Sequence, residues 1–181
     1  MGLVYAPDEP SEDQLTPADE PGGGPGRAAF RRVLGHFPTG VTVVSALGPQ
    51  GPVGLSIGSF TSVSLDPPLI GFLPALASRS WPSIRDAGSF AVSVLGAAQE
   101  PVARLFAAPH DDRFGGVAWK PAPVSGAPVL EGSAAWLDCA VESVHPAGDH
   151  VFVLGRVLDL GVLDEDAVPL VFFRGHYRRL A

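Results

Sequence analysis

Short apolar segments separated by turn-forming residues make up most of the chain after residue 26. β-branched and aromatic residues dominate these segments, and Gly or Pro interrupts them every few positions, which is typical of strands joined by turns. The pattern predicts strands at 41–47, 53–57, 60–65, 69–73, 89–95, 134–144, 150–160 and 169–177. About eight short strands in one chain favour a closed or partly closed antiparallel barrel.

Helical spacing of apolar residues is limited to three short segments. Residues 27–37 repeat apolar side chains at this spacing and end at Pro38, residues 81–87 can form one or two turns, and residues 99–107 form a further amphipathic helix. Strands and helices do not alternate as they do in a Rossmann fold. The sequence therefore predicts a mainly β protein with a few short helices.

Composition supports one β-rich domain. The 181 residues suffice for a single sizeable core, and 22 Gly with 19 Pro would interrupt the long helices of a bundle. No apolar run approaches the roughly 18 to 20 residues that cross a bilayer, so we expect a cytoplasmic protein without membrane contact. The single cysteine, Cys139, excludes an internal disulfide and is expected in the core.

The first 26 residues differ from the rest in composition. They are rich in Pro, Gly and acidic side chains, and cannot bury enough apolar surface to offset the entropy of ordering, so we expect a disordered tail. Six carboxylates in this tail supply most of the net charge of −7, which leaves the domain from residue 27 to 181 near −1. Nucleic-acid binding is disfavoured for a domain whose basic side chains do not outnumber its acidic ones.

Closely spaced hydroxyls and glycines lie between Gly54 and Trp81. Residues 54–58 match the Gly-x-Ser-x-Gly nucleophile elbow, but an elbow needs a helix after the serine, whereas residues 59–65 read as a strand followed by Pro67-Pro68. A hydrolase is therefore disfavoured. The remaining interpretations are a solvated strand face or a cofactor site, and both use the same hydroxyls: Ser56, Ser59, Thr61, Ser62 and Ser64.

A second cluster, Ser78-Arg79-Ser80-Trp81, favours the cofactor site. A guanidinium and two hydroxyls in one short segment can converge on a phosphate, with Arg supplying charged donors. The alternative is that a serine caps the following helix. Downstream, Arg113 and Phe114 either begin a surface helix or add a charge and an apolar wall to the same pocket.

Five histidines are scattered along the chain without the spacing of a metal site. Gly148-Asp149-His150 is first of all a turn, because Gly and Asp are turn formers. His150 begins the next predicted strand, so its imidazole either stays exposed in the hairpin or reaches a bound nicotinamide or flavin edge.

Several motifs follow one another along the chain in the order found in the short-chain flavin reductase family. The chain resembles this family, whose members are the reductase components of two-component flavin-dependent monooxygenases. The motifs are Phe37 to Val44, Ser59 to Leu69, Ser78 to Trp81, Arg113-Phe114, Asp138-Cys139, Gly148 to His150 and Gly175 to Tyr177. They span about Phe30 to Tyr177.

The resemblance implies a split, Greek-key-like β-barrel that binds FMN or FAD, usually as a homodimer with the flavin near the subunit interface. It also implies a flavin oxidoreductase that oxidises NADH or NADPH and passes reduced flavin to a separate monooxygenase. The alternative is a flavin-binding or electron-carrying protein without its own nicotinamide turnover.

The resemblance also implies a set of site residues. Catalysis would involve His150, where the nicotinamide docks. Cofactor binding would involve Ser56, Gly58, Ser59, Thr61, Ser62, Ser78, Arg79, Ser80, Trp81, Arg113, Phe114, Gly148, Asp149 and Tyr177. Gly58 lies where many members of the family carry Asn, so a side-chain hydrogen bond is lost there and weaker flavin binding is expected.

Overall fold

The structure, a computed structural model, describes residues 25–109 and 112–180. The acidic segment 1–24, and with it nearly all of the expected disordered tail, lies outside the described residues.

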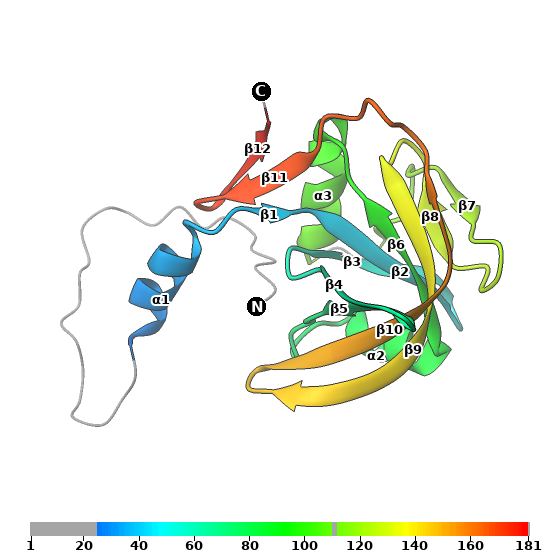
Figure 1. Ribbon diagram of the computed structural model, residues 1–181, viewed down its shortest axis with the longest axis horizontal. Coiled ribbons are helices and arrows are strands. Elements are labelled where there is room, and N and C mark those ends of the chain that lie inside the picture. The colour runs from blue at the N-terminus through cyan, green and yellow to red at the C-terminus, as the bar shows by residue number, and fades with distance from the viewer. Residues whose placement is uncertain (1–24, 110–111, 181) are drawn as a thin grey trace.

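Seven antiparallel strands form the main sheet, in the order β3-β2-β6-β9-β10-β5-β4 (Figure 1). Their bounds are β2 Thr42–Gly48, β3 Gly51–Ile57, β4 Thr61–Leu65, β5 Pro68–Phe72, β6 Ser89–Val94, β9 Ala135–Ala147 and β10 His150–Val162. β2 and β3 form one antiparallel hairpin and β4 and β5 form another, on either side of residue 58. The sheet is not closed into a barrel, because no ladder joins its two edge strands, β3 and β4, in the described chain. The predicted mainly β, split fold is confirmed.

The helices are short and follow the sequence pattern. α1 covers Arg27–Leu34, α2 covers Trp81–Ala87, and α3 covers Glu100–Ala107 after the 3-10 turn η1 at Ala97–Gln99. α2 ends at Gly88, whose left-handed backbone (φ 71°) suits glycine.

Two smaller sheets complete the fold. β1 (Thr39–Gly40) pairs with β11 (Leu170–Phe173), which pairs with β12 (His176–Arg179), and β7 (Trp119–Pro121) pairs with β8 (Pro128–Leu130). The prediction of one strand over 169–177 is wrong. Arg174 and Gly175 both have positive φ, 50° and 78°, and turn the chain into a hairpin.

The core lies between the faces of the curved main sheet. Phe72 and Phe90 are fully buried there with ring centroids 5.3 Å apart. Gly155 of β10 allows this packing, since a Cβ atom at Gly155 would lie 2.5 Å from Phe90 Cζ. Cys139 belongs to the same core, as expected, and burial raises the pKa of its thiol to about 12. No helix within the described part of the chain is long and apolar enough to cross a membrane.

α1 lies apart from the main sheet and buries none of its residues (Figure 1). Its apolar side chains point to solvent instead of a core, with Phe30 43%, Val33 67% and the following Phe37 70% exposed. α1 joins the β11–β12 hairpin through the Arg174 N–H, which donates to the Gly35 carbonyl. We call α1, β1, β11 and β12 the arm, and residues 41–169 the body.

Candidate functional site

The free edge of β3 forms one wall of the candidate site. β3 pairs with β2 alone among the described strands. On the edge of β3 that faces away from β2, the Gly54 carbonyl accepts a hydrogen bond from Arg113 Nη1 at 2.9 Å. Backbone groups alternate along an antiparallel strand, so the N–H and C=O of Ser56 face the same free edge.

A hollow of about 280 Å³ lies between this edge and the segment from Leu73 to Arg79. We call it the first hollow. Its apolar lining is supplied by β3, by the segment before α2 and by the end of α3: Leu55, Ile57, Leu73, Ala75, Ala77, Phe106, Ala107 and Pro109. The polar lining consists of Ser78, Arg79 and Arg113.

A smaller hollow of about 150 Å³ adjoins it and shares Arg79 and Arg113. We call it the second hollow. Its other lining residues are Pro52, Val53, Gly54, Ser80 and Phe114. The two predicted clusters, Ser78 to Ser80 and Arg113-Phe114, therefore meet here although more than thirty residues separate them in the chain.

Hydrogen bonds hold the Arg113 guanidinium in a fixed position between the hollows. Nη1 donates to Ser80 Oγ at 2.5 Å as well as to Gly54, and Nε and Nη2 donate to the Ala108 carbonyl at 3.2 and 2.8 Å. A guanidinium anchored to three separate segments keeps its charge in place without a bound ligand.

Phe114 is fixed by aromatic packing next to Arg113. Its ring lies edge-on to Phe106 and Trp119, with centroids 5.0 and 6.4 Å away. The Asp112 carboxylate accepts hydrogen bonds from the Phe114 and Gly115 N–H groups. Phe114 is thus a rigid apolar wall of the second hollow.

Ser78 and Trp81 have structural contacts as well. Ser78 Oγ accepts a hydrogen bond from the Trp81 N–H at 3.3 Å, whereas Ser80, the N-cap residue of α2, makes no side-chain capping hydrogen bond. The Trp81 ring is buried in the core, edge-on to Phe72. Trp81 therefore positions the segment that carries Ser78 and Arg79.

The hydroxyls after β3 lie at a third hollow of about 460 Å³, along the seam between arm and body. Gly58, Ser59 and Thr61 line it opposite Leu34, Phe37, Pro38, Thr39 and Gly40. Ser59 Oγ accepts the Leu73 N–H at 2.9 Å and so reaches the rim of the first hollow. A Cβ atom at Gly58 would lie 3.1 Å from Thr39 Oγ1, so the Thr39 hydroxyl takes the space next to residue 58.

The other predicted hydroxyls are spread over different surroundings. Ser62 is exposed on β4, whereas Ser56 is buried. Tyr177 packs edge-on to Phe172, and the Arg104 guanidinium lies 4.9 Å from its ring centre. The pKa of Tyr177 lies above its ordinary value, because burial raises it by more than the charge of Arg104 and a hydrogen bond with Ser56 lower it.

The turn Gly148-Asp149-His150 is pinned to the segment that lines the first hollow. Gly148 has φ 68°, which suits the first position of a two-residue hairpin turn. The Leu76 N–H donates to the Asp149 carbonyl, and the Val151 N–H donates to the Pro74 carbonyl. His150 therefore lies beside Ala75, at the rim of the first hollow.

His150 is oriented by its neighbour. Its Nδ1 lies 2.7 Å from Asp149 Oδ1, and its side chain is largely covered while that of Asp149 is exposed. The hydrogen bond to His150, then the charge of that imidazole and, more weakly, the charge of Arg27 lower the pKa of Asp149. Because Asp149 engages Nδ1, Nε2 is the imidazole nitrogen that remains for a ligand.

The donor set fits a phosphorylated planar cofactor. Two guanidiniums and two hydroxyls suit a phosphate, and the apolar first hollow beside a free strand edge suits a flat ring with hydrogen-bonding groups on one side. Among residues 25–109 and 112–180, no three His, Cys, Asp or Glu side chains gather as a metal site would require.

The sequence did not identify the apolar lining of the site. Leu73, Ala75 and Phe106 look like ordinary core or turn residues in the sequence, because periodicity cannot tell a core face from a cofactor face. Thr39 was within a recognised motif, but its approach to Gly58 depends on the pairing of β1 with β11.

Fold and site together define a split-sheet protein that binds a phosphorylated ring cofactor. The family described as "Flavin reductase like domain" matches residues 34–181, and the chain belongs to that family. The predicted family is confirmed.

Similar proteins carry related names. A flavin reductase from Pseudomonas putida is 48% identical over 149 residues, which cover 82% of this chain and 86% of that protein. The reductase subunit HsaB of a flavin-dependent monooxygenase from Rhodococcus jostii is 44% identical, covering 82% and 75% of the two chains. The Streptomyces globisporus NADH:FAD oxidoreductase SgcE6, solved with NAD and FAD fragments, has a TM-score of 0.81 and 41% identity over 86% of this chain and 93% of its own.

Proposed function

We propose that this protein is an NAD(P)H-dependent flavin reductase that supplies reduced flavin to a separate monooxygenase. The observation that carries the proposal is the first hollow, with Arg79 and Arg113 at one end and the His150 turn at its rim, in a member of the flavin reductase family. Relatives named flavin reductase and monooxygenase reductase subunit support the same activity.

The flavin ring lies in the first hollow under this proposal, against Leu55, Ile57 and Leu73. Its phosphate is held by Ser78, Arg79, Ser80 and Arg113. The backbone at Ser56 and Gly58 and the hydroxyls at Ser59, Thr61 and Ser62 contact the ring edge and the ribityl chain. A bound flavin supplies the acceptor for a hydride from NADH or NADPH.

The nicotinamide docks beside His150, and the chain contributes by positioning. Gly148 shapes the turn, Asp149 fixes the imidazole, and the apolar lining excludes water from the ring face. Tyr177, which shares a hydrogen bond with Ser56, closes the pocket beside β3. No covalent contribution from the protein is needed.

The proposal includes a homodimer in the cytoplasm. Phe30, Val33 and Phe37 expose an apolar stripe on the arm, and exposed apolar patches of this kind mark contact surfaces. A second copy of the chain covers the stripe in our proposal. The monooxygenase is the other partner.

The activity is tested by NADH and NADPH consumption with FMN or FAD. We expect flavin-dependent consumption, and a fall in kcat/KM of about 100-fold in His150→Ala, because nicotinamide positioning is lost. The matched control is His145→Ala, an exposed histidine on β9 whose partner is Ser143.

Two results would contradict the proposal. If neither nucleotide is consumed with either flavin, the reductase assignment fails. If the protein binds flavin stoichiometrically and shows no turnover, it is a flavin-binding or electron-carrying protein instead.

A further inference from the structure

A further hollow, of about 430 Å³, lies beside the small sheet of β7 and β8, on the side of the body opposite α1 (Figure 1). We call it the β7–β8 hollow. Its lining comes from residues 120–123 and 129–133, from Trp136 near the start of β9, and from Leu163 and Asp164 after β10. In the described chain it shares no lining residue with the three hollows around the candidate site. The flavin site therefore does not account for this space.

One hydroxyl in this lining is buried without a hydrogen-bond partner. Ser133 is 1% exposed, and no residue that the structure describes forms a hydrogen bond with its Oγ atom. A buried hydroxyl in this situation has lost its hydration without compensation, which costs free energy and is rare in folded proteins. The serine side chain has three staggered rotamers, so a rotation about χ1 can turn Oγ toward a ligand in the hollow.

Trp136 supplies an aromatic wall. Its indole lies close against β10, where a Cβ atom at Gly161 would be 2.8 Å from Trp136 Nε1. The ring also packs on a small core cluster and stays only partly buried; that cluster consists of Ala91, Ala122, Ala127 and Val129. An indole fixed on one side and open on the other suits the stacking of a planar ligand.

Hydrogen bonds hold the walls of the hollow in place. Gln99 Nε2 donates to the Glu131 carbonyl at 3.0 Å. The N–H groups of Leu163 and Asp164 both donate to the Ala134 carbonyl. Because these walls are already ordered, a ligand loses little affinity to ordering the protein.

The charges around the hollow disfavour an anion. Lys120 Nζ lies 3.5 Å from Glu131 Oε1, so the ammonium is already paired within the protein. Asp164 adds a second carboxylate to the lining. A ligand with a carboxylate or phosphate would meet net negative charge here, whereas a neutral ligand would not.

We propose that the β7–β8 hollow binds a neutral, planar aromatic molecule that carries a hydroxyl group. The ring stacks on Trp136 and contacts Val129 and Leu130, and the hydroxyl forms a hydrogen bond with Ser133. This site is separate from the proposed flavin site, and the inference does not depend on flavin reduction.

The test is calorimetric titration of the full-length protein with β-naphthol, with and without added FMN. We expect a dissociation constant below about 1 mM that FMN does not change, because the two sites share no residue. β-Naphthoate, in which a carboxylate replaces the hydroxyl, should bind at least about tenfold more weakly. In nitrogen–proton NMR spectra the Trp136 indole signal, identified by its loss in Trp136→Phe, should shift on titration. The signal of Trp81, which is buried in the core, should not.

Ser133→Ala distinguishes a ligand-binding hydroxyl from an ordinary packing residue. It should weaken β-naphthol about fivefold, because one hydrogen bond is lost. It should also raise the urea midpoint of the ligand-free protein, because a buried unpaired hydroxyl is removed. Ser83→Ala, a half-buried serine on α2, is the matched control and should change neither quantity.

A second pair of variants tests the hollow without touching its buried wall. Leu163→Glu, at a lining position that is 53% exposed, should weaken β-naphthol about tenfold, because a hydrated carboxylate replaces apolar surface. Leu160→Glu, at a position of β10 that is 60% exposed and outside the lining, should leave the affinity unchanged.

Four results would overturn the inference: no binding of β-naphthol up to about 5 mM, equal binding of β-naphthoate, displacement by FMN, or unchanged affinity in Ser133→Ala. None of these results affects flavin-dependent NADH consumption, so a failure here is distinguishable from a failure of the proposed function.

Discussion

Body and arm are built differently. In the body, the main sheet encloses a core in which Phe72, Phe90 and Val153 have no exposed surface. In the arm, α1 buries none of its residues, and the β11–β12 hairpin is attached mainly through Leu170 and Tyr177, which pack with the second core cluster beside α3. The body is held by its own packing, whereas the helix of the arm is not buried by any other described part of the chain.

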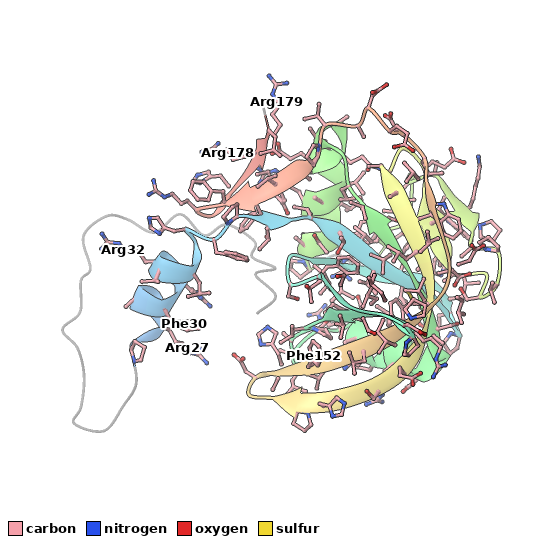
Figure 2. The ribbon with its side chains drawn as sticks, in the orientation of Figure 1. Arg27, Phe30, Arg32, Phe152, Arg178 and Arg179 are labelled. Atoms are coloured by element: carbon pink, nitrogen blue, oxygen red, sulfur yellow. The ribbon has the colours of Figure 1, made fainter. Side chains whose placement is uncertain are left out.

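Charge separates the two regions as sharply as packing does. The arm segments 27–40 and 170–181 contain six arginines and no carboxylate, whereas residues 41–169 contain thirteen carboxylates and six cationic side chains. The arginines of the arm are Arg27, Arg31, Arg32, Arg174, Arg178 and Arg179. Figure 2 shows Arg178 and Arg179 projecting from the far end of the hairpin. A domain charge near −1 therefore conceals a cationic arm on an acidic body.

The largest expected difference concerns stability. Phe90→Ala should lower the free energy of unfolding by about 3–5 kcal/mol, because it empties a fully buried site against Phe72 and Gly155. Phe30→Ala in the arm should cost less than about 1 kcal/mol at protein concentrations where the chain is monomeric. Urea unfolding of both variants measures the contrast, and equal losses would mean that α1 is packed as firmly as the core.

Dimer formation should be more sensitive to a substitution in the arm than to one in the body. Val33→Glu places a charge in the apolar stripe of α1 and should raise the dimer dissociation constant about 100-fold, because a buried unpaired carboxylate is costly. Val124→Glu, at a similarly exposed apolar position of the body, should leave the dimer intact. Sedimentation velocity over a concentration series decides this. A dimer that survives Val33→Glu and dissociates in Val124→Glu would show that the dimer interface lies on the body.

Cations of the two regions should differ in their effect on flavin binding. Arg113→Lys should weaken FAD and FMN about tenfold, because an ammonium cannot hold Gly54, Ser80 and Ala108 together. Arg178→Lys on the arm should leave both affinities unchanged. Flavin fluorescence titrations provide the measurement, and a matching loss in Arg178→Lys would show that the arm helps to hold the cofactor.

Most of the body could be predicted from the sequence, because each strand there has its own local signal. Turn residues mark both ends of β2 and β3, and apolar residues fill the interior of β6. The β11–β12 hairpin was missed because a non-glycine residue, Arg174, takes a left-handed conformation in its turn. Local patterns do not reveal that kind of turn.

The polar half of the site was likewise predictable, since Arg79 and Arg113 belong to recognisable motifs. Their convergence was not, because it depends on Ser80 meeting Arg113 across 33 positions of the chain. The apolar lining from Leu73 and Phe106 carries no sequence signal that differs from a core residue. Nor does the sequence indicate that α1 lies apart from the main sheet.

The smallest expected effect occurs where arm and body influence each other, at Asp149. In the folded protein the His150 hydrogen bond, and more weakly the charge of Arg27 on α1, hold the pKa of Asp149 below its ordinary value of 3.8. Because the folded pKa is the lower one, the interaction stabilises the fold above pH 3.8 and is lost as the pH falls through the lowered value.

NMR titration of the Asp149 carboxyl should show a rise of its pKa in His150→Ala and a smaller rise in Arg27→Gln. Arg32→Gln, on the same helix, is the control and should leave the titration unchanged. An Asp149 pKa that does not change in Arg27→Gln would mean that the charge of α1 has no influence on this turn of the body.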